Sequence, residues 1–209
     1  SSVTQWPHAA QSQAELVREA QFLHSQSELA LQHYAAAEQS ITLLLAQPLD
    51  NSRRSLLTEQ LASSIYQQAQ QADASMDQVQ QHLQRLLTQL PDSAYHEAAA
   101  YQQISLLLSA QNWTAAIPLL QRFIQRYPQT ERGIAAKAQL LDSYEQAEQW
   151  DKAAAELSRL AGAATAPAEQ REALYLAAQY YQRAGLSDQA VAAWRSYANR
   201  YHQPHLLAQ

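Results

Sequence analysis

The histidines and carboxylates of this chain are the side chains with the widest chemical range. Seven histidines are present, and cysteine is absent. His202 and His205 lie three residues apart, yet no third His, Asp or Glu follows at a spacing typical of zinc sites. His24 and His33 lie nine apart and have no such third residue either. The pattern predicts solvated or hydrogen-bonded histidines and no metal site.

Acid–base catalysis has one candidate pair of residues. Asp142 and Glu145 are three residues apart, so a helix would place both carboxylates on one face. Solvated charge is the better interpretation of this pair. The motifs GxSxG and HExxH are absent, and the three glycines of the chain could not form most phosphate-binding loops. We therefore predict a protein that is not an enzyme and uses no cofactor.

Charge and hydropathy argue against two classes of partner. The formal net charge is −5, and the basic residues are scattered, so a nucleic-acid partner is not expected. Arg53-Arg54 is the only adjacent basic pair, and it predicts a solvated helix start. The longest apolar stretch, Ile41 to Ala46, is far shorter than the roughly 20 residues that span a bilayer. The opening residues lack the features of a signal peptide, which leaves open whether one was removed or never included.

Composition and periodicity predict an all-α protein. Only 3 Gly and 7 Pro stand against a background rich in Ala and Gln, with 33 Gln among 209 residues. A 37-residue interval separates four small or apolar residues: Val79, Ala116, Ala153 and Ala190. Self-similarity at such a period is typical of stacked arrays, in which each unit completes the core of its neighbour.

Around these residues the chain resembles the tetratricopeptide repeat (TPR) family of helix pairs. The matching residues are Tyr144 and Tyr181 in first helices, Gly185 at a turn, the three alanines after the turns, and Pro91 and Pro128, each twelve residues past a repeat position. The departures are Ile104 and Leu141 at close-contact Gly positions, Lys137 at an apolar position, and Thr165 and His202 at Pro positions. The resemblance implies an all-α, right-handed superhelical solenoid of antiparallel helix pairs, with four to five units.

In TPR arrays the first helices line a concave face that binds peptides or partner proteins. The register carries that role to ten residues here: Gln68, Gln71, Tyr101, Ser105, Asp142, Glu145, Tyr175, Gln179, Gln182 and Arg183. This predicted groove is polar and rich in Gln, and two tyrosines would add apolar contacts. Ala138 and Asp142 occupy positions of the basic clamp that grips acidic chaperone tails, so that partner is disfavoured.

The predicted domain organisation has four parts: an unstructured lead-in at 1–8, a degenerate helical unit at 9–52, a TPR-like array at 53–204, and the start of a further helix at 205–209. Residues 9–48 could form one long helix or a pair, and the register favours a pair. Expected helix caps are Ser75 with Gln78, Asn112, Thr130 and Ser187. Pro118 predicts a bend or a later helix start.

Two functions follow from this organisation. The first is a non-catalytic scaffold that binds a peptide or a partner protein, as part of a larger protein. The second is a self-assembly module that forms oligomers through its repeat ends. The repeat resembles bacterial cell-envelope TPR proteins, which implies a periplasmic or envelope location in a Gram-negative bacterium, with the cytoplasm as the alternative. The identity of the partner is not contained in the sequence.

Overall fold

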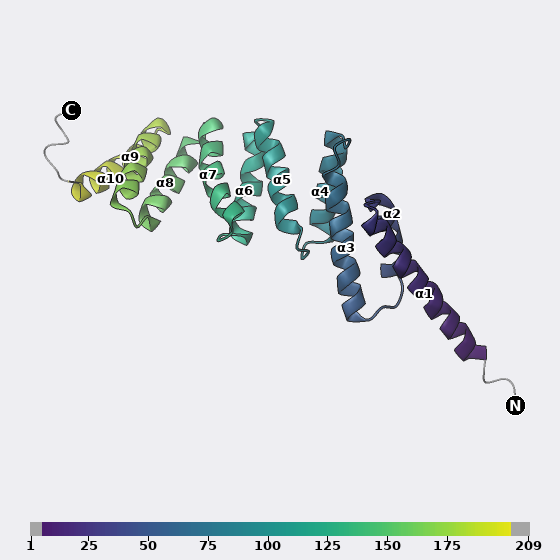
Figure 1. The fold of residues 1–209 in the computed structure, drawn as a ribbon. Helices are drawn as coiled ribbons and strands as arrows, with labels where there is room; N and C mark the ends of the chain where they lie inside the picture. The colour runs from purple at the N-terminus through teal and green to yellow at the C-terminus, as the bar shows by residue number, and fades with distance from the viewer. Residues whose placement is uncertain (1–5, 202–209) are drawn as a thin grey trace. The chain divides into compact units, whose positions relative to one another are not determined.

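The computed structural model describes residues 6–201, with side chains described from residue 12. These residues form ten α-helices and no strand: α1 (Trp6–Ala30), α2 (Tyr34–Leu45), α3 (Asn51–Ala69), α4 (Met76–Gln89), α5 (His96–Ser109), α6 (Trp113–Arg126), α7 (Glu131–Gln146), α8 (Trp150–Ala163), α9 (Pro167–Arg183) and α10 (Ser187–Arg200). Short turns join them, and successive helices reverse direction (Figure 1). The all-α fold of helix pairs predicted from the sequence is confirmed.

The chain divides into two compact units, and the boundary falls inside α5 between Gln103 and Ile104. In unit 1, α1 packs on α2, α2 on α3 and α3 on α4. Four fully buried residues form the core of this unit: Ala37, Ile41, Leu44 and Leu57. Phe22 and Leu29 of α1 pack against this core, so α1 is tied to unit 1 by its apolar contacts.

In unit 2, each helix from α6 to α10 packs on the next one along the chain. Its buried residues come from every one of these helices and include Leu120, Ala136, Leu157 and Ala177. Alanines such as Ala136 and Ala177 let the helix backbones approach one another. The core is therefore built from large side chains such as Leu120 that pack beside small alanines.

The 37-residue repeat has a direct structural counterpart. Ala116, Ala153 and Ala190 are buried near the starts of α6, α8 and α10. Each helix is preceded by a tight turn whose left-handed residue recurs at the same interval: Gln111, Glu148 and Gly185, with φ of 56°, 53° and 73°. The repeat therefore fixes a backbone turn as well as a packing position.

The N-terminal region is a helix pair, because the chain reverses between α1 and α2 at residues 31–33. The helix α1 begins at Trp6, so the last three residues of the expected lead-in are helical. Residues 1–5 and the further helix predicted at 205–209 lie outside the described residues. Within the described residues, the range 53–204 predicted as the array contains most of α3, which begins two residues earlier at Asn51, and all the helices that follow it.

Most predicted helix caps are confirmed. Ser75 and Gln78 form a capping box, while the side chains of Asn112 and Thr130 accept bonds from the amides of Ala115 and Gly133. The prediction for Ser187 is wrong, since that residue begins α10 and Leu186 precedes it as the cap. The helix α6 begins at Trp113 and continues through Pro118, so the alternative of a later helix start is also wrong.

None of the helices within residues 6–201 has both the length and the apolar character that a bilayer-spanning segment requires.

Candidate functional site

The ten residues of the predicted groove are divided between the two units. Gln68, Gln71 and Tyr101 belong to unit 1, and the other seven belong to unit 2. Each set is described within its own unit.

In unit 1, Gln68 is a structural residue rather than a groove residue. Its side chain is 8% exposed, and its amide nitrogen donates to Glu38 Oε2 at 2.6 Å and to the Ser64 carbonyl at 3.2 Å. Arg85 makes an ion pair with the other oxygen of Glu38. A buried amide that already holds a carboxylate has little surface to offer a partner. Gln71 is exposed in the loop after α3, and Tyr101 is half-buried on α5.

Several glutamines of unit 1 hydrogen-bond to one another between successive first helices. Gln26 and Gln60 exchange two amide bonds of 2.9 and 2.8 Å between α1 and α3. Gln70 donates to Gln102 at 2.7 Å, which links the end of α3 to α5. Side-chain amides can both donate and accept, so they satisfy each other when paired. Part of the Gln-rich composition therefore stabilises the helix stack.

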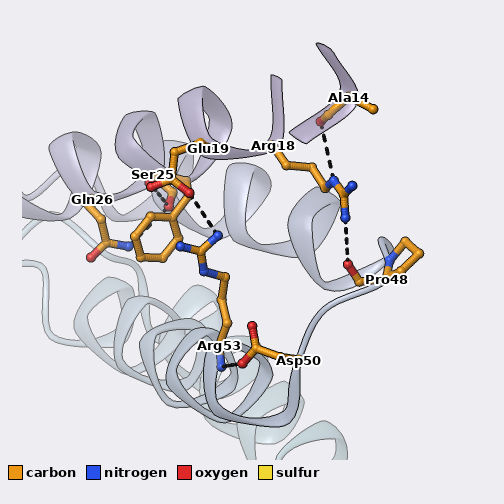
Figure 2. Close-up of polar contacts among 9 residues, drawn as sticks. Ala14, Arg18, Glu19, Ser25, Gln26, Pro48, Asp50 and Arg53 are labelled. Carbon is orange, nitrogen blue, oxygen red and sulfur yellow. Dashed lines mark hydrogen bonds and ion pairs between the residues drawn. The ribbon is translucent and has the colours of Figure 1, made fainter. Parts of the chain in front are cut away.

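A second set of polar contacts holds α1 against the start of α3 (Figure 2). Arg53 donates to Glu19 at 3.0 Å, and its guanidinium carbon lies 4.5 Å from the centroid of the Phe22 ring. Its backbone amide also bonds to Asp50, the cap of α3. Arg54 donates to the carbonyls of Leu45 and Gln47. Both arginines lie at the start of α3, as predicted, and Arg54 is exposed, but both also cross-link elements of unit 1.

In unit 2, a polar contact joins α7 to α9. The Tyr180 hydroxyl donates to Glu145 Oε1 at 2.8 Å. Burial raises the pKa of Tyr180 above its usual value, and the carboxylate of Glu145 raises that pKa further. The phenol therefore stays a donor at neutral pH. Asp142, one turn earlier on α7, is exposed.

Trp150, at the start of α8, contacts two side chains of α9. Its ring is 5.2 Å from that of Tyr180, tilted by 56°. The guanidinium carbon of Arg183 lies 4.5 Å from the centroid of the Trp150 ring, a distance typical of cation–π contacts. Of the predicted groove residues, Glu145 and Arg183 are thus brought together through Trp150 and Tyr180, which the sequence-based set omitted.

Tyr175 packs mainly against α10. Its ring is edge-on to Trp194 at 5.3 Å and lies 5.7 Å from Tyr197, and its side chain remains 41% exposed. Of the other predicted residues in unit 2, Gln182 is exposed, while Ser105 and Gln179 are half-buried. Tyr175 therefore stabilises the last helix pair while still presenting one side to solvent.

One exposed apolar residue of unit 2 was missed by the sequence analysis. Ile134 is 59% exposed and stands two turns before Asp142 on the same face of α7, with Ala138 between them. The buried stripe of α7 runs through Ala136, Leu140 and Tyr144, so Ile134 falls off that stripe, and periodicity could have revealed it. We define the α7–α9 face by seven residues: Ile134, Ala138, Asp142, Glu145, Tyr175, Gln179 and Arg183.

In the part of the chain that the structure describes, no three His, Asp or Glu side chains lie close enough together to hold a metal ion. An apolar hollow lies between α8 and α9. It is lined by Leu157, Leu160, Ala163, Ala164, Glu169, Glu172, Ala173 and Leu176. Its two carboxylates both come from α9, and the remaining lining residues are apolar, so the hollow contains no acid–base pair opposed across it.

No family model and no curated protein matches this sequence. Among solved structures, the chain is similar to the nearly identical TPR-like repeats of a Podosopora anserina protein described as a kinesin light chain, at 15% identity and a TM-score of 0.43, over 88% of this chain and 97% of that one. It is also similar to MamA of AMB-1, at 16% identity and a TM-score of 0.41, over 93% and 99% of the two chains. At TM-scores this low, the similarities support no conclusion about function. The assignment of paired helices comes from the structure of this chain itself.

Proposed function

We infer that this protein is a non-catalytic interaction scaffold whose α7–α9 face binds a peptide or a segment of a partner protein. The observation that carries the proposal is the cation–π contact between Arg183 and Trp150. The Trp150 ring restrains the guanidinium, while Arg183 itself is exposed, so its N–H donors can meet a carboxylate of a ligand. Arg183 is therefore the proposed receptor for a carboxylate of the partner.

The surroundings of Arg183 support this role. Glu145 already accepts a hydrogen bond from Tyr180, which makes this carboxylate a weaker competitor for the guanidinium. Ile134 and Tyr175 add exposed apolar surface, and Asp142 adds an exposed charge. Mixed apolar and polar contacts of this kind are typical of surfaces that bind peptides selectively. The best ligand is therefore a short segment that combines a carboxylate with apolar residues.

Selection of a random peptide library on the intact chain would test the proposal. We expect the selected peptides to share an acidic residue or a free C-terminal carboxylate beside apolar residues. Arg183→Gln should weaken their binding by roughly 10- to 100-fold, because hydrogen bonds to charged groups contribute about 1.5–3 kcal/mol. Arg195→Gln, which changes an exposed arginine on α10, is the matched control and should bind as the wild type does.

Peptides that bind the Arg183 variant as tightly as the wild type would contradict the proposal.

The proposal also includes a cell-envelope location, which rests only on the resemblance of the repeat. Fractionation of the source cells, probed with an antibody to this chain, checks that location; recovery in the cytosol alone would exclude it.

A further inference from the structure

The long helix α1 has two very different faces. One face points into unit 1: Ser25 is fully buried, and Phe22 and Leu29 pack on the core. Arg18 donates to the Pro48 carbonyl at 3.3 Å, and Glu19 pairs with Arg53, so polar contacts also tie α1 to the α2–α3 loop and to α3 (Figure 2). The packing of α1 within unit 1 therefore uses one side of the helix.

The opposite side of α1 is exposed and largely apolar. We call it the α1 ribbon, and it consists of Leu16, Val17, Ala20, Leu23, His24, Ser27 and Leu31, the last residue lying just past the helix end. Leu16 is 69% exposed, Leu23 57% and Leu31 62%. These large apolar side chains on one helix face would be costly to leave in water.

The spacing of the ribbon is that of a helix–helix seam. Leu16, Ala20, Leu23 and Ser27 follow one another at intervals of four, three and four residues, the alternation that keeps a seam facing a second helix. Residues 12–17 are exposed on every side, because this part of α1 extends beyond the part that α2 covers (Figure 1). Short helical stretches without tertiary contacts are marginal in water, so a helix packed on the ribbon would stabilise this segment.

We propose that the α1 ribbon binds the α1 ribbon of a second copy of this chain, in an antiparallel arrangement about a two-fold axis. With the axis between Ala20 and Leu23, each Leu23 lies opposite the small Ala20 of the other copy. Each Leu16 likewise lies opposite Ser27 of the other copy. Large residues facing small ones fill a seam without overlap, and a two-fold axis makes the surface complementary to itself.

Charge also favours a second copy. Only His24 in the ribbon ionises, so two ribbons can meet without burying a carboxylate or an ammonium group. A partner that binds through ion pairs would find only His24 in the ribbon, and this side chain already lies 3.7 Å from Glu28 of its own chain. The inference is independent of the α7–α9 face, which lies in the other unit of the chain.

The oligomeric state of the intact chain is the primary test. Sedimentation equilibrium across a dilution series should show the mass rising from one copy to two, since a seam from Leu16 to Leu31 is only roughly 24 Å long and should dissociate on dilution. The double variant Leu16→Glu/Leu23→Glu should stay monomeric at every concentration. Met76→Glu, at a residue 58% exposed on α4, is the matched control and should dimerise as the wild type does.

Circular dichroism keeps this result interpretable. The double variant should retain the helical content and unfolding transition of diluted wild type, because both leucines are exposed in the single chain. A wild type that remains monomeric throughout the series would overturn the proposal and leave the ribbon to a different protein. A dimer, or a larger oligomer, that survives in the double variant would overturn it as well.

The orientation is tested separately by spin labels. The chain has no native cysteine, so Ser12→Cys gives one label on the exposed start of α1. In the antiparallel dimer, Ser12 of one copy lies near Leu31 of the other, and 19 residues of helix separate the labels by roughly 28 Å. A parallel pair would bring them within roughly 10 Å, the distance between packed helices, and would contradict the proposed geometry.

Discussion

At the scale of single residues, Gly133 shows how one backbone contact determines an amino acid. It is the third residue of α7, and its amide donates to the cap Thr130 at 3.1 Å. A Cβ at this position would lie 1.7 Å from the Tyr127 carbonyl oxygen. Gly162 of α8, by contrast, has no atom within 4 Å of such a Cβ. The two helical glycines therefore form a matched pair.

We expect Gly133→Ala to lower the free energy of unfolding by about 1–3 kcal/mol, because a clash with backbone outweighs the gain in helix propensity. Gly162→Ala should raise it by about 0.4–1 kcal/mol, through the lower entropy of the unfolded chain. Urea unfolding monitored by circular dichroism measures both changes. Equal effects of the two substitutions would disagree with the described approach of Tyr127.

His82 gives a pH-dependent prediction at the same scale. Its Nδ1 is buried without a hydrogen-bond partner; burial lowers the pKa of His82 below 6.5, Arg85 lowers it further, and Glu38 opposes this. The unfolded chain therefore binds a proton near pH 6.5 that the folded chain does not. Stability contributed by His82 is present above pH 6.5 and is lost as the pH falls from 6.5 towards the lowered pKa.

We expect His82→Gln to reduce this loss of stability on acidification. Urea unfolding at a series of pH values above and below 6.5 measures the slope for both proteins. A slope identical to that of the wild type would show that protonation of His82 is not linked to folding.

At the scale of elements, the turns before α6, α8 and α10 all need a left-handed residue. Only Gly185 has the residue type that adopts this conformation without strain, whereas Gln111 and Glu148 carry side chains at positive φ. The resemblance to TPR units pointed to a glycine turn, and the sequence provides it only in the last repeat.

We expect Glu148→Gly to raise the free energy of unfolding by about 0.5–1 kcal/mol, since relief of the left-handed strain exceeds the added entropy of the unfolded chain. Gly185→Ala should lower it by about 1 kcal/mol for the converse reason. Thermal unfolding of both variants checks the pair. Destabilisation by Glu148→Gly would show that the glutamate makes a compensating contact.

At the scale of the whole molecule, two cores are present in one chain. Leu57 is fully buried in unit 1, and Leu120 is fully buried in unit 2. Contacts between neighbouring repeats are local in arrays of this kind, so destabilisation should remain largest near its origin.

Leu57→Ala should therefore accelerate hydrogen exchange in α2 and α3 more than in α6 and α7. Leu120→Ala should do the reverse, and each should cost about 2–5 kcal/mol locally. Mass spectrometry of peptides from each unit measures both. Uniform acceleration along the chain in either variant would indicate one cooperative body instead.

The sequence alone determined the helical class, the repeat and most of the caps. These features depend on neighbours within a few residues or on a regular interval, as with Ser75 and Gln78 or with Ala116 and Ala153. Propensity, capping and periodicity are all local properties, and each can be read from residue types in order.

Only the tertiary structure decided what the polar side chains do. Gln68 and Arg53 look like surface residues in the sequence, yet their partners, Glu38 and Glu19, lie 30 and 34 residues away. Arg183 likewise depends on Trp150, a residue of another helix. A hydrogen bond or a stacked ring requires an approach of a few ångströms, and folding sets that approach through the packing of whole helices.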